Sequence, residues 1–418
     1  MRTVVVGGGL AGLAAALDLT DAGHAVTLVE ARPTLGGAVQ TLPERDGDPP
    51  PAPDNGQHIA LGACTEYLRF LRRVGRGDAL ARRPLALPVV DESGRVAILG
   101  AGALRLLRYR HLPLRERLTV ARVTRRLATL DPAEHDDVTF AELLRAHGQP
   151  DAAVSRFWDI FMRPALNVRS AEASAALALF TIRTGLLGPR GSSDLLLPLA
   201  PLGAMHGDAA ARALTLAGAE IRLRTRATAV EPGAVVLADG GRIEADAVVV
   251  AVPPDESARL LGEDPPPLED SPIVSAHLLF DRTLLGFPLA ALLGSPAHWL
   301  FDRGRLTGTR PAPGQYLTVV TSGVPELLDT RGRDLVALLA GEVTARLGPA
   351  NVLWSRVSRE PAATFLGRPG TETLRPGPET GVPGVVRAGA WTRTGWPATM
   401  EGAIRSGRRA ARLLIDDA

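Results

Sequence analysis

Three glycines close to the N-terminus, Gly7, Gly9 and Gly12, have the spacing G-x-G-x-x-G and directly follow a short apolar, β-branched stretch. In this spacing the first glycine permits a tight turn, the second lets the backbone approach a pyrophosphate, and the third allows a helix to pack closely on a strand. Leu10 and Ala11 would begin that helix, where unpaired amides and the positive dipole end bind phosphate. The spacing therefore predicts a dinucleotide site.

An acidic residue, Glu30, closes the second predicted strand of the same unit. Ala and Leu dominate residues 13–22, which favours a helix, and residues 25–29 have the composition of a buried strand. A carboxylate at this place accepts hydrogen bonds from ribose hydroxyls, and its charge disfavours the 2′-phosphate of NADP. Because strand, helix and acid follow in the right order, binding is favoured over a chance glycine spacing and over a merely solvated Glu30.

A second glycine pair, Gly36-Gly37, stands soon after Glu30. It is either an ordinary turn or a loop that contacts the cofactor. Its position favours the cofactor loop.

The elements that must position these residues are drawn from separated parts of the chain. Residues 46–54 form a loop rich in Pro and Asp, and residues 103–202 have a largely helical pattern. We predict a hairpin over 85–99, further helices over 209–217 and 399–415, and strands over 221–225, 234–237, 246–254, 273–281, 316–321 and 384–388.

Composition narrows the possible classes. The 418 residues leave room for two domains, and 45% hydrophobic residues is ordinary for a globular protein. A net charge of +2 argues against nucleic-acid binding, and we expect no metal site. All 47 basic residues are Arg, and the single Cys64 excludes an intramolecular disulfide.

No targeting or spanning segment is expected. Glycines interrupt the N-terminal apolar run, so it does not resemble a signal peptide. Residues 177–202 come closest to a membrane span, but charged residues, Gly and Pro interrupt them. We therefore expect a cytoplasmic protein.

Four motifs in chain order resemble those of the FAD-dependent amine oxidase and carotenoid desaturase superfamily. They are the N-terminal fingerprint, Gly36-Gly37, the strand ending Ala251-Val-Pro253, and a C-terminal Gly-x-Trp followed by a helix. A closer resemblance, to the hydroxysqualene dehydroxylases, rests on three segments: Asp54-Asn-Gly-Gln-His58, Asp194-Leu-Leu-Leu-Pro198, and Thr394 to Ala403. The last is the most specific, because a ten-residue string is hard to match by chance.

The resemblance implies an α/β fold with a Rossmann-like FAD-binding domain of the glutathione-reductase type and an inserted α+β substrate domain. We place the first in residues 1–75, 205–260 and 365–418, and the second in residues 76–204 and 261–364. The implied reaction removes the hydroxyl group of hydroxysqualene with hydride from reduced FAD and gives squalene. FAD carries the hard chemistry, so the protein must hold it, exclude water and shape an apolar slot.

The resemblance also implies which residues bind FAD. The fingerprint, Glu30 and Gly36-Gly37 bind its adenosine and phosphates, and the segment before the last helix lies at the flavin. Val230 lends its backbone to the adenine or is merely part of the core. The remaining implied contacts are Ala31, Arg32, Ala38, Asn55, Gly56, Ala251, Pro253, Gly389, Ala390, Trp396, Pro397, Ala398, Thr399 and Met400.

Gln57 and His58 are the candidate catalytic residues. The resemblance places them near the flavin ring, where His58 would protonate the departing hydroxyl if its pKa permits. The alternative is a structural histidine, which is the more common role of a lone His. Of the residues before the Leu-rich segment, Trp158 is expected to pack in a core and Asn167 to face the cavity.

Two residues depart from the superfamily's pattern. Ala38 replaces an Arg near the phosphates, and Ala390 replaces the Asp of Gly-Asp-Trp. Each loses a contact that contributes about 1–3 kcal/mol. Arg32 is placed to supply the missing cation.

Arg alternates with Leu over residues 104–118. This pattern indicates either a basic amphipathic surface that rests on anionic lipid at the inner face of the cell membrane, or an ordinary helix pair with an exposed Arg-rich face. An apolar isoprenoid substrate favours the lipid contact, and a prenyl synthase of the same pathway is a possible partner.

Two other functions remain open. One is a FAD-dependent desaturase or oxidase of another isoprenoid or a secondary metabolite, working in the oxidative direction. The other is a non-catalytic flavin-fold scaffold, which Ala38 and Ala390 keep in consideration. An amine oxidase that uses a Lys beside the flavin is excluded, because the chain has no Lys.

Overall fold

The structure is a computed structural model, and it describes residues 1–416. A five-stranded parallel sheet, in the order β18-β12-β1-β2-β8, carries the glycine fingerprint at the end of its central strand. Its strands are β1 (Arg2–Val6), β2 (Ala25–Val29), β8 (Glu220–Arg222), β12 (Ala247–Val250) and β18 (Val385–Arg387). The runs of Val in β1 and β12 suit a sheet that is covered on both faces.

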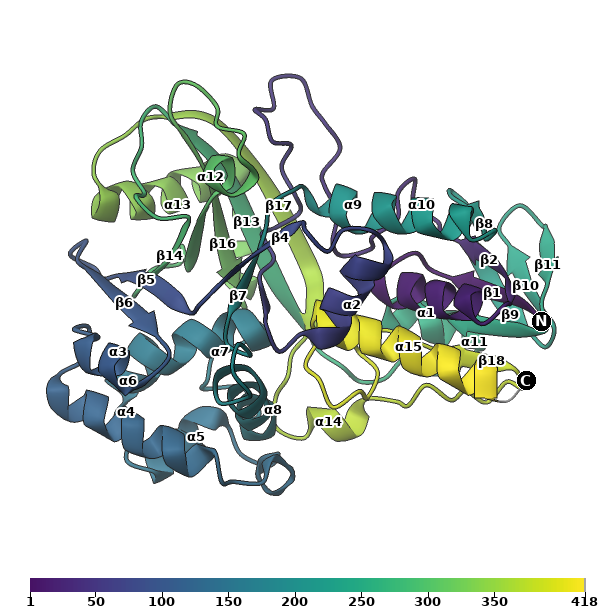
Figure 1. Ribbon diagram of the computed structural model, residues 1–418, viewed down its shortest axis with the longest axis horizontal. Helices are drawn as coiled ribbons and strands as arrows, with labels where there is room; N and C mark the ends of the chain where they lie inside the picture. The colour runs from purple at the N-terminus through teal and green to yellow at the C-terminus, as the bar shows by residue number, and fades with distance from the viewer. Residues whose placement is uncertain (417–418) are drawn as a thin grey trace.

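Helices cover one face of this sheet. Val5 points toward them and joins a core formed with α1 (Leu10–Asp21), α2 (Thr65–Arg73), α10 (Gly207–Leu216) and α15 (Met400–Asp416). Figure 1 shows the yellow α15 running beside the purple α1, although the two lie at opposite ends of the sequence. A Cβ on Gly407 would lie 2.0 Å from the carbonyl oxygen of Ala11, so the two helices pack backbone to backbone.

A small antiparallel sheet and one helix cover the other face. Val4 and Val6 join that core, as strand alternation requires. Its elements are β9 (Ala227–Glu231), β10 (Ala234–Leu237), β11 (Arg242–Glu244) and α11 (Pro254–Leu261).

A second large sheet has seven strands in the order β17-β13-β16-β15-β14-β5-β6. These are β5 (Ala86–Val90), β6 (Val96–Gly100), β13 (Asp270–Phe280), β14 (Leu289–Leu292), β15 (Trp299–Asp302), β16 (Gln315–Ser322) and β17 (Val352–Phe365). The helix α13 (Gly332–Leu347) covers one face, and a group of helices packs against the other.

That helical group surrounds Trp158, which is fully buried and donates a hydrogen bond to Gln149. The expected packing role of Trp158 therefore agrees with the structure. The group comprises α3 (Ala103–Arg108), α4 (Leu114–Leu127), α5 (Phe140–Ala146), α6 (Asp151–Ala153), α7 (Asp159–Leu166) and α8 (Ala175–Thr181), with a 3-10 turn at Pro132–His135 and π-helical turns at Val154–Trp158 and Ile182–Leu186.

The remaining elements are short. They are β3 (Ala60–Leu61), β4 (Leu80–Arg83), β7 (Leu195–Pro198), α9 (Leu202–Met205), α12 (Arg303–Thr307), a 3-10 turn at Pro325–Leu327, and α14 (Thr371–Leu374). Three of them, β3, β7 and β4, form a small sheet of their own. Within residues 1–416 we find no helix with the length and apolar character needed to cross a membrane.

The expected fold class is confirmed, and two local expectations are wrong. Residues 103–202 are not helical throughout, because β7 is a strand that pairs with β3 and β4. The strand expected over 221–225 ends at Arg222, since Arg224 has a left-handed φ of 53°. The boundaries given above for the two discontinuous domains stay a prediction.

Candidate functional site

Two of the three fingerprint glycines, Gly7 and Gly12, occupy positions that no side chain would fit. Gly7 has a φ of 105°, and a Cβ there would lie 2.4 Å from the carbonyl oxygen of Ala251. A Cβ on Gly12 would lie 1.9 Å from the carbonyl oxygen of Gly7. Gly9 precedes α1 and offers no side chain to cap it. The first-turn amides, including those of Leu10 and Ala11, therefore face outward without intrahelical partners.

The second glycine pair lies directly against this loop. The Gly36 amide donates to the Gly8 carbonyl oxygen at 2.8 Å, and a Cβ on Gly37 would lie 2.8 Å from the Cα of Gly9. Two backbone segments without side chains thus form one cradle at the N-terminus of α1. This arrangement fits the pyrophosphate of a dinucleotide, which needs close backbone approach and free amides.

Glu30 reaches over the same cradle. One oxygen of its carboxylate accepts the Gly8 amide at 2.8 Å, and the other accepts the Arg32 amide at 2.7 Å. Ala31, Arg32 and Ala38 are exposed nearby. The carboxylate is therefore fixed beside the glycine loop by two backbone amides. Its role as a ribose ligand stays a prediction.

The end of β12 adjoins the cradle from the other side. The Ala251 amide donates to the Val6 carbonyl oxygen at 2.7 Å, and Pro253 precedes the first turn of α11. Val230 lies on β9 opposite Val235 of β10, and its side chain is buried in the core beside the parallel sheet. That burial agrees with the packing alternative for its side chain and leaves its backbone role a prediction.

One arginine, Arg375, holds the loop that follows β18, Gly389 to Thr392, in place. Arg375 is almost fully buried and donates to the carbonyl oxygens of Ala390, Trp391 and Thr392. It also pairs with Glu372. The indole nitrogen of Trp391 donates to the Val252 carbonyl oxygen at 3.0 Å, which joins this loop to the end of β12.

Residues 396–400 lead into α15. Thr399 caps this helix, since its hydroxyl accepts the Gly402 amide at 3.1 Å. A Cβ on Gly402 would lie 2.7 Å from the Pro397 carbonyl oxygen, so the segment Trp396, Pro397, Ala398, Thr399 and Met400 is folded tightly onto the first turn. The helix N-terminus therefore has a fixed orientation within the junction of the two sheets.

The segment Asp54–His58 is fixed by contacts with both large parts of the molecule. Asp54 is fully buried and accepts hydrogen bonds from the Leu202 amide and the Thr41 hydroxyl. Its other carboxylate oxygen forms an ion pair of 2.7 Å with Arg303. Arg303 begins α12, which lies between β15 and β16 of the seven-stranded sheet. Burial raises the pKa of Asp54, and the Arg303 guanidinium opposes that rise.

The side chains that follow share these anchors. Asn55 donates to the carbonyl oxygen of Ala38 at 2.8 Å and so links the segment to the Gly36-Gly37 loop. The side-chain oxygen of Gln57 accepts a hydrogen bond from Arg303 at 3.0 Å. Asn55 and Gln57 are thus held by separate contacts, one to the loop that carries Ala38 and one to Arg303, with Gly56 between them and His58 directly after.

His58 keeps part of its surface open, yet protein atoms surround the ring closely. This desolvation lowers the pKa of His58 to about 4. At neutral pH the imidazole is therefore uncharged and acts as a hydrogen-bonding group. An anion placed within a few ångströms would raise that pKa again, as the role of proton donor requires.

Asn167 has a structural role, and its expected place at the cavity stays a prediction. It ends α7 in a left-handed conformation and is buried, with its amide nitrogen donating to the Ser271 carbonyl oxygen at 2.9 Å and to the Thr364 hydroxyl at 3.1 Å. Its structural task is to fasten α7 to β13 and β17.

Arg303 and Arg375 are the positioning residues that sequence reasoning missed. Each stands among 47 chemically identical arginines, and each acts on a segment far away in the chain. No local pattern distinguishes them from surface arginines.

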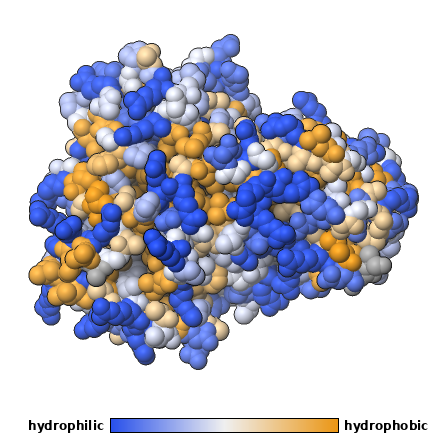
Figure 2. Space-filling view, viewed as in Figure 1, coloured by the Kyte–Doolittle hydropathy of each residue, from blue (hydrophilic) through white to orange (hydrophobic). Residues whose placement is uncertain are grey.

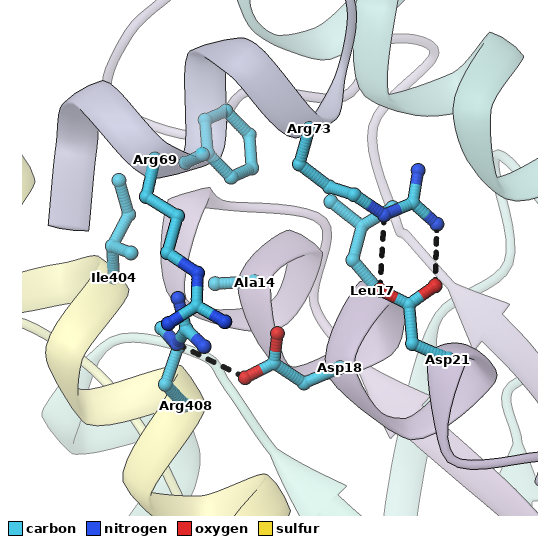
Figure 3. A pocket seen from close by; sticks show the side chains of 9 residues that line it. Ala14, Leu17, Asp18, Asp21, Arg69, Arg73, Ile404 and Arg408 are labelled. Carbon is cyan, nitrogen blue, oxygen red and sulfur yellow. Dashed lines mark hydrogen bonds and ion pairs between the residues drawn. The ribbon is translucent and has the colours of Figure 1, made fainter.

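A surface hollow between α1, α2 and α15 is separate from this site. Figure 3 shows Arg73 directed at Asp21 and Arg408 at Asp18, with the apolar Ala14, Leu17 and Ile404 behind them. The pairs are 2.6 Å and 3.0 Å long. They link the three helices at the end of α1 away from the glycine loops.

Comparisons with known proteins identify the family. Residues 10–415 match the family described as flavin containing amine oxidoreductase. Hydroxysqualene dehydroxylase of Sinorhizobium fredii is 30% identical over 434 residues, covering 99% of this chain and 98% of the relative. The 15-cis-phytoene desaturase of Solanum lycopersicum is 26% identical, covering 100% of this chain and 78% of the relative.

Solved structures share the fold. An oxidoreductase from Methanosarcina mazei superimposes with a TM-score of 0.77 at 16% identity, covering 99% of this chain and 100% of that one. Cyclohexylamine oxidase from Brevibacterium oxydans superimposes with a TM-score of 0.74 at 18% identity, covering 100% and 99%.

Proposed function

The chain belongs to the flavin-containing amine oxidoreductase family, in the branch of the hydroxysqualene dehydroxylases, and from this premise we propose that it removes the hydroxyl group of hydroxysqualene to give squalene. It is an FAD-dependent oxidoreductase. The single observation that carries the specific reaction is the 30% identity to a hydroxysqualene dehydroxylase along practically the whole of both chains.

The described residues fit FAD. The two glycine segments at the N-terminus of α1 would hold the pyrophosphate, and Glu30 would hold the adenosine ribose. The loop Gly389–Ala390 and the N-terminus of α15 would hold the rest of the cofactor. Bound in its reduced form, FAD supplies the hydride that replaces the hydroxyl.

The protein's own part in the reaction is to orient the alcohol, exclude water and assist the loss of the hydroxyl. Loss of an allylic hydroxyl leaves a carbocation, which water would capture in an open site. Gln57 and His58 are the polar groups we assign to this step. His58 is neutral when nothing lies beside it, so its proton becomes available only where an anion raises its pKa.

Product analysis tests the proposal. The FAD-loaded protein is incubated without oxygen with hydroxysqualene and dithionite, and the lipid extract is examined by mass spectrometry. We expect squalene to accumulate with enzyme-dependent kinetics, and much less of it with Gly9→Val, which fills the cradle. A wild-type reaction that leaves hydroxysqualene unchanged while FAD is bound overturns the proposal.

Desaturation of an isoprenoid is the second candidate, supported by the similarity to phytoene desaturases. The two functions run the flavin in opposite directions. An oxidised, yellow protein that bleaches without oxygen when a saturated isoprenoid is added would favour desaturation. Under the leading proposal the same mixture stays yellow.

We also propose that the surface of α3 and α4 rests on anionic lipid, from which an isoprenoid alcohol would enter. Four leucines there are strongly exposed: Leu104 at 72%, Leu114 at 57%, Leu118 at 56% and Leu107 at 40%. Figure 2 shows apolar side chains gathered at the left edge over α3, bordered by hydrophilic ones. The neighbouring arginines, Arg105, Arg108, Arg110 and Arg115, are exposed as well.

Flotation with vesicles containing phosphatidylserine checks this surface. We expect the protein to rise with the vesicles, and L104E/L107E to remain below while its melting midpoint is unchanged. Equal flotation of both proteins would contradict the proposal.

A further inference from the structure

The hydroxyl of Ser275, in the middle of β13, has no exposed surface and no hydrogen-bond partner among residues 1–416. A buried polar atom without a partner is costly, so native proteins keep few of them. Such an atom points to a group that comes from outside the chain.

Ser275 faces the candidate site. Residues 275 and 277 lie on the same face of β13, because side chains alternate along a strand. The imidazole of His277 meets the carbonyl oxygen of Asp54 at 2.8 Å, so this face of the strand lies against the segment Asp54–His58. The Ser275 hydroxyl therefore points toward the residues assigned to the loss of the hydroxyl group.

Gly56 lies between two polar atoms, Oγ of Ser275 and Nε2 of His58. A Cβ on Gly56 would lie 3.3 Å from Oγ of Ser275 and 3.9 Å from Nε2 of His58. The φ of Gly56 does not lie in the left-handed region, so its backbone conformation would accept another residue. A side chain at position 56 would nevertheless crowd Oγ of Ser275, so the glycine leaves this polar atom uncovered on the side of His58.

We propose that Ser275 Oγ, together with His58 Nε2 across Gly56, binds the hydroxyl group of the substrate and thereby distinguishes the alcohol from its hydrocarbon product. The inference rests on the proposed function and names the residue that recognises the group to be removed. The hydroxyl group of the substrate can donate one hydrogen bond and accept others. The Ser275 hydroxyl and the neutral His58 imidazole together offer it both an acceptor and a donor. Squalene has no such group, so it loses these contacts and leaves.

Binding to the oxidised holoenzyme isolates this recognition from turnover, because no hydride is available. The dissociation constants of hydroxysqualene and squalene are measured from the perturbation of the flavin absorbance, in wild type, Ser275→Ala and Ser170→Ala. Ser170 is the matched control, since its hydroxyl is equally buried and lacks a partner among the described residues, but it lies beyond α7 in the helical group.

We expect wild type to bind the alcohol about ten- to a hundredfold more tightly than squalene, the range of two neutral hydrogen bonds. Ser275→Ala should lower this ratio about three- to tenfold by weakening the alcohol alone, with the contact of His58, the affinity for squalene and the content of FAD unchanged. Ser170→Ala should keep the wild-type ratio. Ser275→Thr, which retains the hydroxyl, should recover part of the preference.

An unchanged ratio in Ser275→Ala overturns the inference, and so does an equal loss of affinity for both ligands. In either case conversion of hydroxysqualene by wild type would leave the proposed function standing. A wild type that binds neither compound and converts neither overturns both.

Discussion

The buried pair of Asp54 and Arg303 shows how single residues shape the site. Arg303 is almost fully buried, and its guanidinium contacts Asp54, the side chain of Gln57 and the carbonyl oxygen of Ala52. Removing one member of a buried pair leaves an uncompensated charge and costs about 3–5 kcal/mol. The pair therefore holds the candidate catalytic segment in place, and we expect neither Asp54 nor Arg303 to tolerate substitution.

We predict that Arg303→Ala lowers the unfolding free energy by about 3–5 kcal/mol and weakens FAD binding, because Asp54 stays buried without a cation. Urea denaturation followed by circular dichroism measures the change. Arg282→Ala, which breaks an exposed ion pair with Asp281, serves as control and should leave stability nearly unchanged. A wild-type stability for Arg303→Ala would contradict this account of the segment.

Ala390 is the second informative position. Its carbonyl oxygen is held by Arg375, but its side chain offers no polar contact. We predict that Ala390→Asp tightens FAD binding about tenfold, which corresponds to one charge-assisted hydrogen bond of about 1.4 kcal/mol. Fluorescence titration of the apoprotein measures the dissociation constant, with the distant, exposed Ala152→Asp as control. Weaker binding by Ala390→Asp would show that the loop has adapted to the smaller residue.

Among the elements, α1 and its neighbouring strands were predictable, because each carries a strong local signal. The glycine spacing, the Ala-rich helix and the Val-rich strands agree with one another, and the hairpin around residues 91–94 formed as expected. The glycine loops at the N-terminus of α1 were predicted in the same way, as glycines at fixed distances from a strand end, whereas the other candidate cofactor residues came from the family resemblance and stay a prediction.

Other elements could not be predicted, because tertiary contacts decide them. The Leu run of β7 has no period that separates a strand from a buried helix, and only pairing with β3 and β4 settles it. The long strand β17 contains polar residues and Pro361, and it was missed since its partner β13 lies some eighty residues earlier. The positions of Arg303, Arg375 and Ser275 in the site follow from such pairings.

The contact of α1 with α15 gives a prediction for the helices. A Cβ on Gly407 would overlap the carbonyl oxygen of Ala11, whereas one on Gly341 in α13 meets open space. We expect Gly407→Ala to separate the helices, lower the melting midpoint by several degrees and reduce FAD content, because Ala11 belongs to the first turn of α1. Gly341→Ala should instead stabilise the protein by about 0.5–1 kcal/mol. Equal effects of both variants, measured by thermal unfolding, would contradict the backbone-to-backbone packing.

At the scale of the whole molecule, four histidines are buried in a neutral form. Burial lowers the pKa to about 4 for His58 and His206 and to about 3 for His277 and His298. The unfolded chain titrates near 6.5, so between these values it binds more protons than the folded chain. Stability is therefore complete above pH 6.5 and falls as the pH drops toward 4.

For each such histidine, the free energy of unfolding falls by about 1.4 kcal/mol for every pH unit below 6.5. Four of them exhaust a typical stability of about 5–15 kcal/mol within two or three pH units. We predict cooperative acid unfolding above pH 4, observed by circular dichroism, and a shallower loss in His277→Gln. Carboxylates with a lowered pKa, such as Asp91 at about 2, lose their contribution to stability only at a pH below about 4. Full stability at pH 4 would contradict the neutral burial of these rings.

The segment Asp54–His58 joins the two large sheets. We expect the cofactor and the alcohol to meet at the junction between these sheets. Figure 1 shows this junction between the parallel sheet, with α1 and α15, and the long strands β13 and β17. The proposed reaction requires reducing equivalents to pass from the flavin to the alcohol there.

A single-turnover measurement tests that claim most directly. The holoenzyme is reduced under nitrogen with one equivalent of dithionite and mixed with hydroxysqualene, while flavin absorbance and squalene are followed together. We expect the yellow colour to return at the rate at which squalene forms, with one squalene formed for each flavin reoxidised. A flavin that stays reduced in the presence of bound hydroxysqualene, with no squalene formed, would contradict it.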